Sequence, residues 1–410
     1  MNRPFLGPRV VFVSFLTLIG AFGLNLTAGQ FFSPLHGIYG WSLTTLSLAV
    51  SLNMLTWGIF QPVMGRLIDR FGPKPVIAGS AALMGIAFLL SSTITQIWQF
   101  FVYYGILTAV GFAGCGSMAN SVLVSRWYVR NRAVMLARSS MGMNVGQLVL
   151  LPLAGMLIAY TNFRITFLVL GFMMLLIIVP AFLLLTKNTP QSIGQAPDGD
   201  PTSTFTPPRS APLSEALQSR VFWLASLAFV TCGYSLYMVT IHLPKYAVDL
   251  GGGLDLGGRL LGIAAAASAV SMWITGQLSK THRKKILLIW LYAIRAMALF
   301  FLAVSAHLWQ LYVFAVLYGI SSMPIIPLVT GMISERFGAN ALGSILGSTW
   351  LLHQIFAAIG VFVGGYLRSA TGNYHLSFLT SAVALVMGAL LTAALREPGN
   401  MAHLRADRTC

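Results

Sequence analysis

Long apolar segments separated by short polar ones run through the whole chain. Twelve apolar segments of roughly 20 residues or more can be distinguished, and each is long enough to cross a bilayer as a tilted helix. They cover approximately residues 10–33, 42–65, 74–95, 98–124, 133–159, 163–186, 220–245, 258–279, 285–305, 308–334, 341–366 and 374–395. None shows the alternation of apolar and polar residues typical of a membrane β-strand. The pattern therefore predicts an all-α membrane protein with twelve transmembrane helices.

A polar, proline-rich segment at residues 187–219 divides the predicted helices into two groups of six. The two groups resemble each other, because a Gly-Arg-Leu run beginning at Gly65 follows the second helix and a Gly-Gln-Leu run beginning at Gly276 follows the eighth. Such repeats are typical of transporters that bind their substrate between the halves, near the membrane midplane. We expect two pseudo-symmetric six-helix bundles joined by a linker and followed by a tail, at residues 1–186, 187–219, 220–396 and 397–410.

The composition agrees with a membrane protein and excludes an ordinary soluble one. Of the 410 residues 57% are hydrophobic and only 8% are charged, whereas charged residues make up about 25% of a typical soluble protein. The net charge of +16 would suit a nucleic-acid binder, but the cations lie in short loops between apolar segments rather than on one face of a domain. We therefore expect the lipid bilayer, and no nucleic acid, as a partner.

The distribution of the cations predicts the orientation. With the N-terminus inside, nineteen of the 25 Lys and Arg residues fall in inside segments, and two lie within predicted helices. The remaining four fall outside: Arg164, Lys245, Arg259 and Arg368. Loops rich in Lys and Arg remain in the cytoplasm. We expect a multi-pass protein of the cell (inner) membrane with both termini, the linker and the tail in the cytoplasm.

The loop between the second and third predicted helices resembles the signature of the major facilitator superfamily. It reads GRLIDRFGPK from Gly65 to Lys74, and the whole chain fits the twelve-helix plan of that family. The resemblance implies a gating role for Gly65, Asp69, Arg70 and Gly72, in which Asp69 and nearby cations hold the cytoplasmic ends of the halves together. The corresponding loop after Gly276 has no aspartate.

A narrower resemblance is to the monocarboxylate porters and the bacterial oxalate/formate antiporters. The run WYVRNR from Trp127 to Arg132, followed by Gly142 and Gly146, is similar to the porter signature that enters the fifth helix. Many members of this group have an arginine in the eighth helix that receives a carboxylate, but Met272 stands at that position here. The antiporters' lysine in the eleventh helix also has no counterpart in 341–366. A monocarboxylate is therefore favoured over a dicarboxylate.

Arg295, at the centre of the ninth predicted helix, is the principal candidate for binding an anion. A central arginine costs about 2.5–3.5 kcal/mol on insertion scales, so it should face protein or water. No acidic residue of the chain lies near the middle of a predicted helix, and Arg295 must therefore interact with backbone carbonyls, hydroxyls or an anion. Two interpretations remain open, a substrate-binding arginine and a structural one tied to neighbouring helices.

His353 and several uncharged polar residues complete the candidate substrate site. His353 lies midway along the eleventh predicted helix, where histidine can donate to a carboxylate and carry a proton, or can simply pack in the core. The uncharged candidates are Asn25, Asn120, Asn144, Tyr234 and Tyr237. Asn144 shares a helix face with Gln147. Such residues also serve as contacts between helices.

The sequence has no P-loop, no nucleophile elbow and no metal-binding HExxH run, so we expect no enzyme, no catalytic residues, no metal and no cofactor. The prediction is a monomeric secondary transporter that moves a small organic anion by alternating access. A monocarboxylate such as lactate or pyruvate is the favoured substrate, carried with or without a proton. The alternatives are an exporter of neutral or amphipathic compounds and a membrane sensor that does not transport.

Overall fold

Helices make up almost all of the chain in the computed structural model, which describes residues 4–200, 210–253, 256–338 and 341–395. Within these residues, 12 helical segments are long and apolar enough to cross a membrane. The expected all-α membrane architecture is confirmed. Only helices satisfy every backbone N–H and C=O group inside one segment, as the bilayer core requires for an open chain.

The first six spans comprise α1 (Gly7–Leu26), η1 (Thr27–Phe31), α2 (Phe32–Tyr39), α3 (Leu43–Phe71), α4 (Pro73–Ser91), α5 (Ile97–Phe100), η2 (Phe101–Thr108), α6 (Ala109–Cys115), α7 (Ser117–Trp127), α8 (Arg132–Tyr160), α9 (Phe163–Met173), η3 (Met174–Ile178) and α10 (Val179–Leu185). The first span continues through η1 and α2 as far as Tyr39, beyond the predicted range 10–33. Pro34 lies in the first turn of α2, where proline is tolerated. Gly40 ends α2 with a positive φ of 70°, a conformation that glycine adopts without strain.

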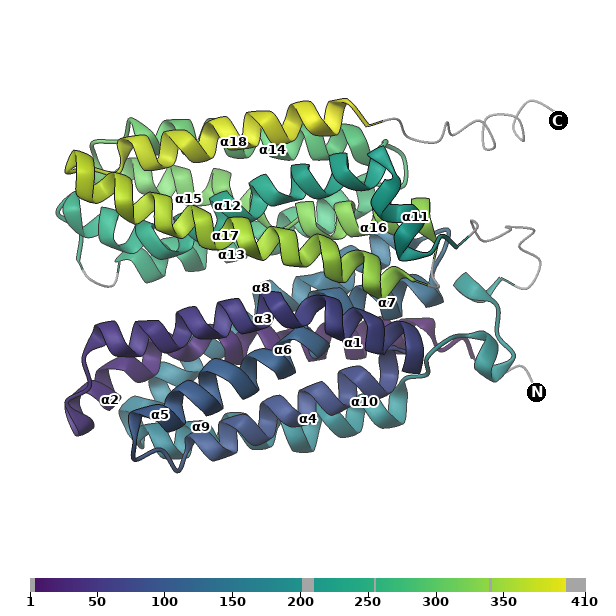
Figure 1. Ribbon diagram of the computed structural model, residues 1–410, viewed down its shortest axis with the longest axis horizontal. Helices are drawn as coiled ribbons and strands as arrows, with labels where there is room; N and C mark the ends of the chain where they lie inside the picture. Colours follow the sequence, from purple (N-terminus) through teal and green to yellow (C-terminus); the bar gives the residue numbers. More distant parts are fainter. Residues whose placement is uncertain (1–3, 201–209, 254–255, 339–340, 396–410) are drawn as a thin grey trace.

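Short helices occupy the described parts of the linker: η4 (Gln191–Ile193), η5 (Pro197–Gly199) and α11 (Leu213–Gln218). The last six spans comprise α12 (Arg220–Asp249), α13 (Leu256–Leu278), α14 (Lys284–Ala303), α15 (Leu308–Ser322), α16 (Ile325–Phe337), α17 (Leu342–Thr371) and α18 (His375–Ala393). The spans pack in two layers, one formed by α1–α10 and the other by α12–α18 (Figure 1).

The two ends of the molecule differ. The linker helix α11 lies at the end where α10 finishes and where α7 and α16 lie, and we call this the linker end (Figure 1). The helices α2 and α5 lie at the opposite, far end (Figure 1). At the linker end, Asp198 accepts hydrogen bonds from the backbone N–H groups of Val129, Arg130 and Asn131 at 2.9, 2.8 and 3.1 Å. The start of the linker is thereby attached to the loop that precedes α8.

Two spans that the apolar pattern predicts as single helices are broken at equivalent places. The first break lies at Gly116, between α6 and α7, where Asn120 Nδ2 donates to the carbonyls of Cys115 (2.7 Å) and Gly116 (3.0 Å). The second lies between α15 and α16, where Pro324 precedes the first residue of α16. Proline and glycine interrupt membrane helices where neighbouring groups satisfy the freed backbone atoms.

The halves contact each other along α3 with α17 and along α8 with α13. These contacts depend on glycine. A Cβ atom at Gly65 would lie 2.2 Å from the carbonyl oxygen of Gly343, and one at Gly276 would lie 2.7 Å from Cβ of Ala137. Small residues allow membrane helices to approach this closely. The loop glycines of both repeats therefore lie where one half meets the other.

Candidate functional site

A small polar cavity lies between the two halves at mid-depth. Its volume is about 30 Å³, which is room for one or two water molecules. It is lined by Asn144 and Gln147 of α8, Leu236 and Thr240 of α12, Leu261, Ala264, Ala265 and Ser268 of α13, and Tyr318, Ser322 and Met323 at the end of α15. Asn144 lies roughly 18 Å along α8 from the linker end, at a rise of 1.5 Å per residue. We call this space the polar cavity.

Polar atoms without partners from both halves lie at the polar cavity. Asn144 is only 1% exposed, yet neither its Nδ2 nor its Oδ1 atom has a hydrogen-bond partner among the described residues. The Ser268 hydroxyl on the opposite wall is also buried and without a partner there. Buried polar groups are nearly always hydrogen-bonded, and each exception requires an explanation. The arrangement offers donors and acceptors from both halves to a polar group placed between them.

Arg295 is fully buried inside the second half. Its Nη1 donates to Sγ of Cys232 at 3.1 Å, and its Nη2 lies 3.4 Å from both the Cys232 carbonyl and the Tyr318 hydroxyl. The guanidinium carbon also lies 5.0 Å from the centre of the Tyr318 ring. No ion pair involves Arg295 within the described residues. The arginine therefore faces protein, as its cost in lipid requires.

Tyr318 separates Arg295 from the polar cavity. Its side chain lines the cavity, while its hydroxyl accepts a hydrogen bond from Arg295 and lies 3.3 Å from the Leu236 carbonyl. The buried cation thus lies one side chain behind the cavity wall. Tyr318, Thr240 and Ser268 are not among the site residues predicted from the sequence. Their positions in the middle of predicted helices were the only available signal, and many residues share that signal.

His353 belongs to a second cluster, where α17 meets α12 and α3. It is 0% exposed, and its ring stacks on Phe229 with a centroid distance of 4.3 Å. Its Nδ1 atom lies 3.1 Å from Oε1 of Gln354. Its Nε2 has no partner among the described residues, as is also true of Trp57 Nε1 and Gln61 Oε1 on α3. His353 does not line the polar cavity.

The other predicted substrate residues also lie away from the polar cavity. Asn120 caps the break between α6 and α7, and the Tyr234 hydroxyl lies 3.0 Å from that of Thr380 on α18. The Asn25 carbonyl accepts a hydrogen bond from the Tyr104 hydroxyl. Tyr237 is half-buried on α12. The structure brings Asn144, but none of these four residues, to the polar cavity, and their part in binding stays a prediction.

The predicted gating residues lie at the contact between the halves near the linker end. Asp69 Oδ1 accepts from the backbone N–H of Gly343 at 2.9 Å, and Oδ2 accepts from the N–H and the hydroxyl of Ser344 at 2.7 and 2.6 Å. Gly343 and Ser344 belong to the first turn of α17, where the N–H groups have no partner within the helix and the dipole favours an anion. We call this contact the Asp69 latch.

Gly72 and Arg70 shape the turn beside the latch. Gly72 ends α3 with a φ of 87°, a conformation that only glycine adopts readily. Arg70 is exposed, and its guanidinium carbon lies 5.1 Å from the centre of the Phe71 ring. The described residues show no ion pair for Arg70, so its contribution to gating stays a prediction.

Comparison with known proteins determines the family. The sequence model of the Major Facilitator Superfamily matches residues 10–361. The chain belongs to the Major Facilitator Superfamily. Its fold agrees with two solved members of this superfamily, the Escherichia coli fucose:proton symporter FucP (TM-score 0.74, 15% identity, 97% of this chain and 100% of that chain) and the proton:xylose symporter XylE (TM-score 0.76, 14% identity, 96% of both chains). This member of the superfamily is therefore a multi-pass membrane transporter and not an enzyme.

Relatives with similar sequences include monocarboxylate transporters. Monocarboxylate transporter 13 of Bos taurus is 24% identical over 388 residues, with 93% of this chain and 87% of that protein covered. Monocarboxylate transporter 11 of Homo sapiens is 25% identical over 390 residues, with 90% and 79% covered. The "Uncharacterized MFS-type transporter YcxA" of Bacillus subtilis (strain 168) is 24% identical over 401 residues, with 93% of each chain covered.

Proposed function

We propose that this chain is a secondary transporter for small organic anions, with monocarboxylates such as lactate or pyruvate as the favoured substrates. One observation carries the proposal: a buried arginine without a carboxylate partner in the described residues lies one tyrosine behind a polar cavity between the halves. A single carboxylate in that cavity would supply the missing negative charge. The similarity to monocarboxylate transporters supports the same substrate class.

A carboxylate fits the groups that line the polar cavity. The Asn144 amide and the Ser268 hydroxyl, which have no partners in the described residues, can donate hydrogen bonds to it. The Tyr318 hydroxyl donates to the Leu236 carbonyl and could donate to a carboxylate only after leaving that acceptor. Hydrogen bonds to an ionised acceptor are about twice as strong as neutral ones. The remaining walls include Leu236, Leu261 and two alanines of α13, which suits a short apolar tail. The lining therefore favours one carboxylate on a small organic group.

Transport requires the contacts between the halves to open and close in turn. A cavity of about 30 Å³ is too small for lactate, so the halves must move apart before such a substrate enters. At the linker end this means breaking the three hydrogen bonds of the Asp69 latch and separating Ser125 of α7 from Ser334 of α16, whose hydroxyls lie 3.3 Å apart. The latch is the gate in this proposal, and the positive-inside bias supports a linker end that faces the cytoplasm.

A proton can accompany the anion in two ways. The substrate can carry it as the neutral acid, or His353 can bind it at Nε2, which has no partner in the described part of the chain. A His353 route requires the ring to become accessible when α3 and α17 separate, because it is 0% exposed in this arrangement. Symport by either route predicts that an imposed pH gradient drives uptake.

Uptake into proteoliposomes tests the function. Purified protein is reconstituted, an inward proton gradient is imposed, and uptake of labelled lactate, pyruvate and benzoate is measured against liposomes without protein. We expect saturable uptake of at least one of these anions and competition from the others. The proposal fails if none of the three moves or competes.

The specific alternative is an exporter of neutral or amphipathic compounds. It is favoured by the complete burial of Arg295 and by the apolar walls of the polar cavity. Expression in a host that is sensitive to toxic apolar compounds separates the two functions. Resistance without monocarboxylate uptake would support the exporter, whereas uptake without resistance would support the anion transporter.

A further inference from the structure

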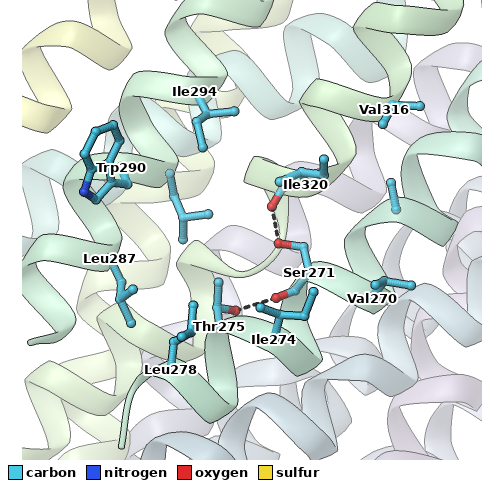
Figure 2. Close-up of a pocket in the computed structure, with 12 residues that line it drawn as sticks. Val270, Ser271, Ile274, Thr275, Leu278, Leu287, Trp290, Ile294, Val316 and Ile320 are labelled. Carbon is cyan, nitrogen blue, oxygen red and sulfur yellow. Dashed lines mark hydrogen bonds between the residues drawn. The ribbon is translucent and has the colours of Figure 1, made fainter. Parts of the chain in front are cut away.

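An apolar groove runs along the outside of the second half, between α13, α14 and α15. Its volume is about 540 Å³, and side chains from all three helices surround it (Figure 2). It is lined by Ala267, Val270, Ser271, Ile274, Thr275 and Leu278 of α13, Leu287, Trp290, Leu291 and Ile294 of α14, and Val316 and Ile320 of α15. We call it the outer groove.

The outer groove faces the lipid, and its walls are almost entirely apolar. Val270 and Trp290 at its rim are 60% and 63% exposed. The two hydroxyls in its wall are already used, because Ser271 donates to the Ile320 carbonyl at 2.5 Å and Thr275 donates to the Ser271 carbonyl at 2.7 Å (Figure 2). The indole N–H of Trp290 is the one side-chain polar group of the lining that has no hydrogen bond within the described residues, so a polar ligand would find little to bind. An acyl chain needs no polar partner.

The length of the outer groove matches one leaflet of a bilayer. From Ala267 to Leu278 the wall formed by α13 is roughly 16 Å long at 1.5 Å per residue. Half of a typical hydrocarbon core is about 15 Å thick. Leu278 and Leu287 lie next to the loop that joins α13 to α14, so the groove begins at the membrane surface of the linker end and ends near the midplane.

That loop carries two cations with no partner among the residues that the structure describes. Lys280 and Arg283 are exposed, and the side chain of neither forms a hydrogen bond or an ion pair within the described residues. The two following lysines are engaged instead. Lys284 forms an ion pair with Glu335 at 2.9 Å, and Lys285 donates to the Leu395 carbonyl at 2.7 Å. Lys280 and Arg283 therefore remain available to a phosphate at the mouth of the groove.

We propose that the outer groove and these two cations form a binding site for one anionic phospholipid. An acyl chain lies along α13 and α14, and the phosphate contacts Lys280 and Arg283. A zwitterionic lipid would place a positive choline beside the same cations and gain less. Each cation near an anionic lipid surface contributes roughly fivefold in affinity, so the pair contributes about 25-fold. The site is separate from the polar cavity and does not depend on the transported substrate.

Native mass spectrometry of the purified full chain tests the proposal. The protein is titrated with phosphatidylglycerol and with phosphatidylcholine of the same acyl chains, and the affinity for the first bound lipid is measured. We expect phosphatidylglycerol to bind more tightly. Equal affinity for the two lipids would overturn the proposal.

Variants then separate the two parts of the site. Lys280→Gln with Arg283→Gln should weaken phosphatidylglycerol binding about 25-fold and leave phosphatidylcholine binding unchanged. Ala267→Trp, which fills the groove from α13, should weaken both lipids. The matched control is Arg220→Gln with Arg336→Gln, which removes two exposed cations of the linker end away from the groove.

Two results would contradict the site. If Arg220→Gln with Arg336→Gln weakens phosphatidylglycerol binding as much as Lys280→Gln with Arg283→Gln, the lipid affinity depends only on the net positive charge of the linker end. If the groove-filling variant binds both lipids as the parent does, the acyl chain lies elsewhere. Should Ala267→Trp fail to yield a monodisperse protein, Val316→Trp fills the groove from the α15 wall and gives the same information.

Discussion

The Asp69 carboxylate caps the first turn of α17 through Ser344, whose N–H and hydroxyl both donate to Oδ2, at 2.7 and 2.6 Å. One side chain of the first half thus satisfies helix N–H groups of the second half. Hydrogen bonds to a charged group contribute about 1.5–3 kcal/mol each. The latch therefore couples the two halves strongly at the linker end and does not involve the residues of the polar cavity.

Asp69→Asn should weaken the closed arrangement of the linker end. The amide has no charge, and its NH₂ group cannot accept, so at least one of the three hydrogen bonds is lost. We expect a shift of about 1.5–3 kcal/mol toward separated halves, from the charged-bond magnitude. Ser125→Cys, placed on the buried face against Ser334, should then react faster with a water-soluble maleimide.

The control for this measurement is the same cysteine with Asp69 intact, after subtraction of labelling in the parent chain. Arg66→Gln, an exposed cation of the same turn, serves as a second control for charge. Labelling rates that are equal with and without the aspartate would show that the latch does not hold the linker end closed.

Arg295→Ala should abolish binding of monocarboxylates. At a ligand concentration of 100 times Kd, binding stabilises the native state by about 2.7 kcal/mol, and a thermal-shift assay of the parent protein should detect this. The variant should be folded but show no shift with the ligand. Unchanged affinity would assign Arg295 a structural role through Cys232 and Tyr318 alone.

Tyr318→Phe tests the path between the arginine and the polar cavity. The ring remains and still lines the cavity, but the hydroxyl that accepts from Arg295 is removed. We expect the affinity for a carboxylate to fall roughly fivefold to tenfold, the equivalent of one hydrogen bond of about 1 kcal/mol or slightly more. Tyr234→Phe is the matched control, because its hydroxyl faces Thr380 on α18. An equal loss in both variants would indicate a general effect on α12 packing.

The features of the fold that can be predicted from the sequence are those that a strong physical constraint determines. The spans were predictable because a chain without the alternation of a β-barrel can cross a bilayer only as long apolar helices. The position of Asp69 between two spans was predictable because its motif has a fixed place there, while its gating role stays a prediction. The breaks at Gly116 and Pro324 were not, because hydropathy alone does not reveal where a membrane helix is interrupted.

The substrate site was harder to predict, because helix rotation decides which polar residues meet. Tyr234 and Tyr318 are both tyrosines in the middle of spans, yet only Tyr318 lines the polar cavity. Arg295 was recognised from its cost in lipid, but its contact with Cys232 follows no sequence pattern. Packing between helices sets these rotations, and they cannot be predicted from the hydropathy pattern of a single sequence.

His353→Gln tests proton coupling. Glutamine keeps a polar side chain beside Gln354 but cannot carry a proton in the physiological range. If His353 carries the proton, the variant should lose uptake driven by a pH gradient and keep exchange of substrate at equal pH. If the substrate carries the proton, both activities should persist in proteoliposomes. Loss of both would indicate that the histidine is needed for packing against Phe229.

Asn144→Leu separates function from stability at the polar cavity. In the parent chain the Asn144 amide is buried without a partner among the described residues, an arrangement that costs about 1–3 kcal/mol. Replacing it by an apolar group of similar size should therefore leave the thermal midpoint unchanged or raise it. Uptake should nevertheless fall, because the first half loses one of its two polar side chains at the cavity and keeps only Gln147. The test measures the thermal midpoint and the uptake on one preparation, with Asn120→Leu as the contrasting variant.

Asn120 caps the break at Gly116, so its replacement should lower the thermal midpoint. A lower thermal midpoint for Asn144→Leu than for the parent chain would mean that this amide stabilises the fold, and would contradict a role in substrate binding.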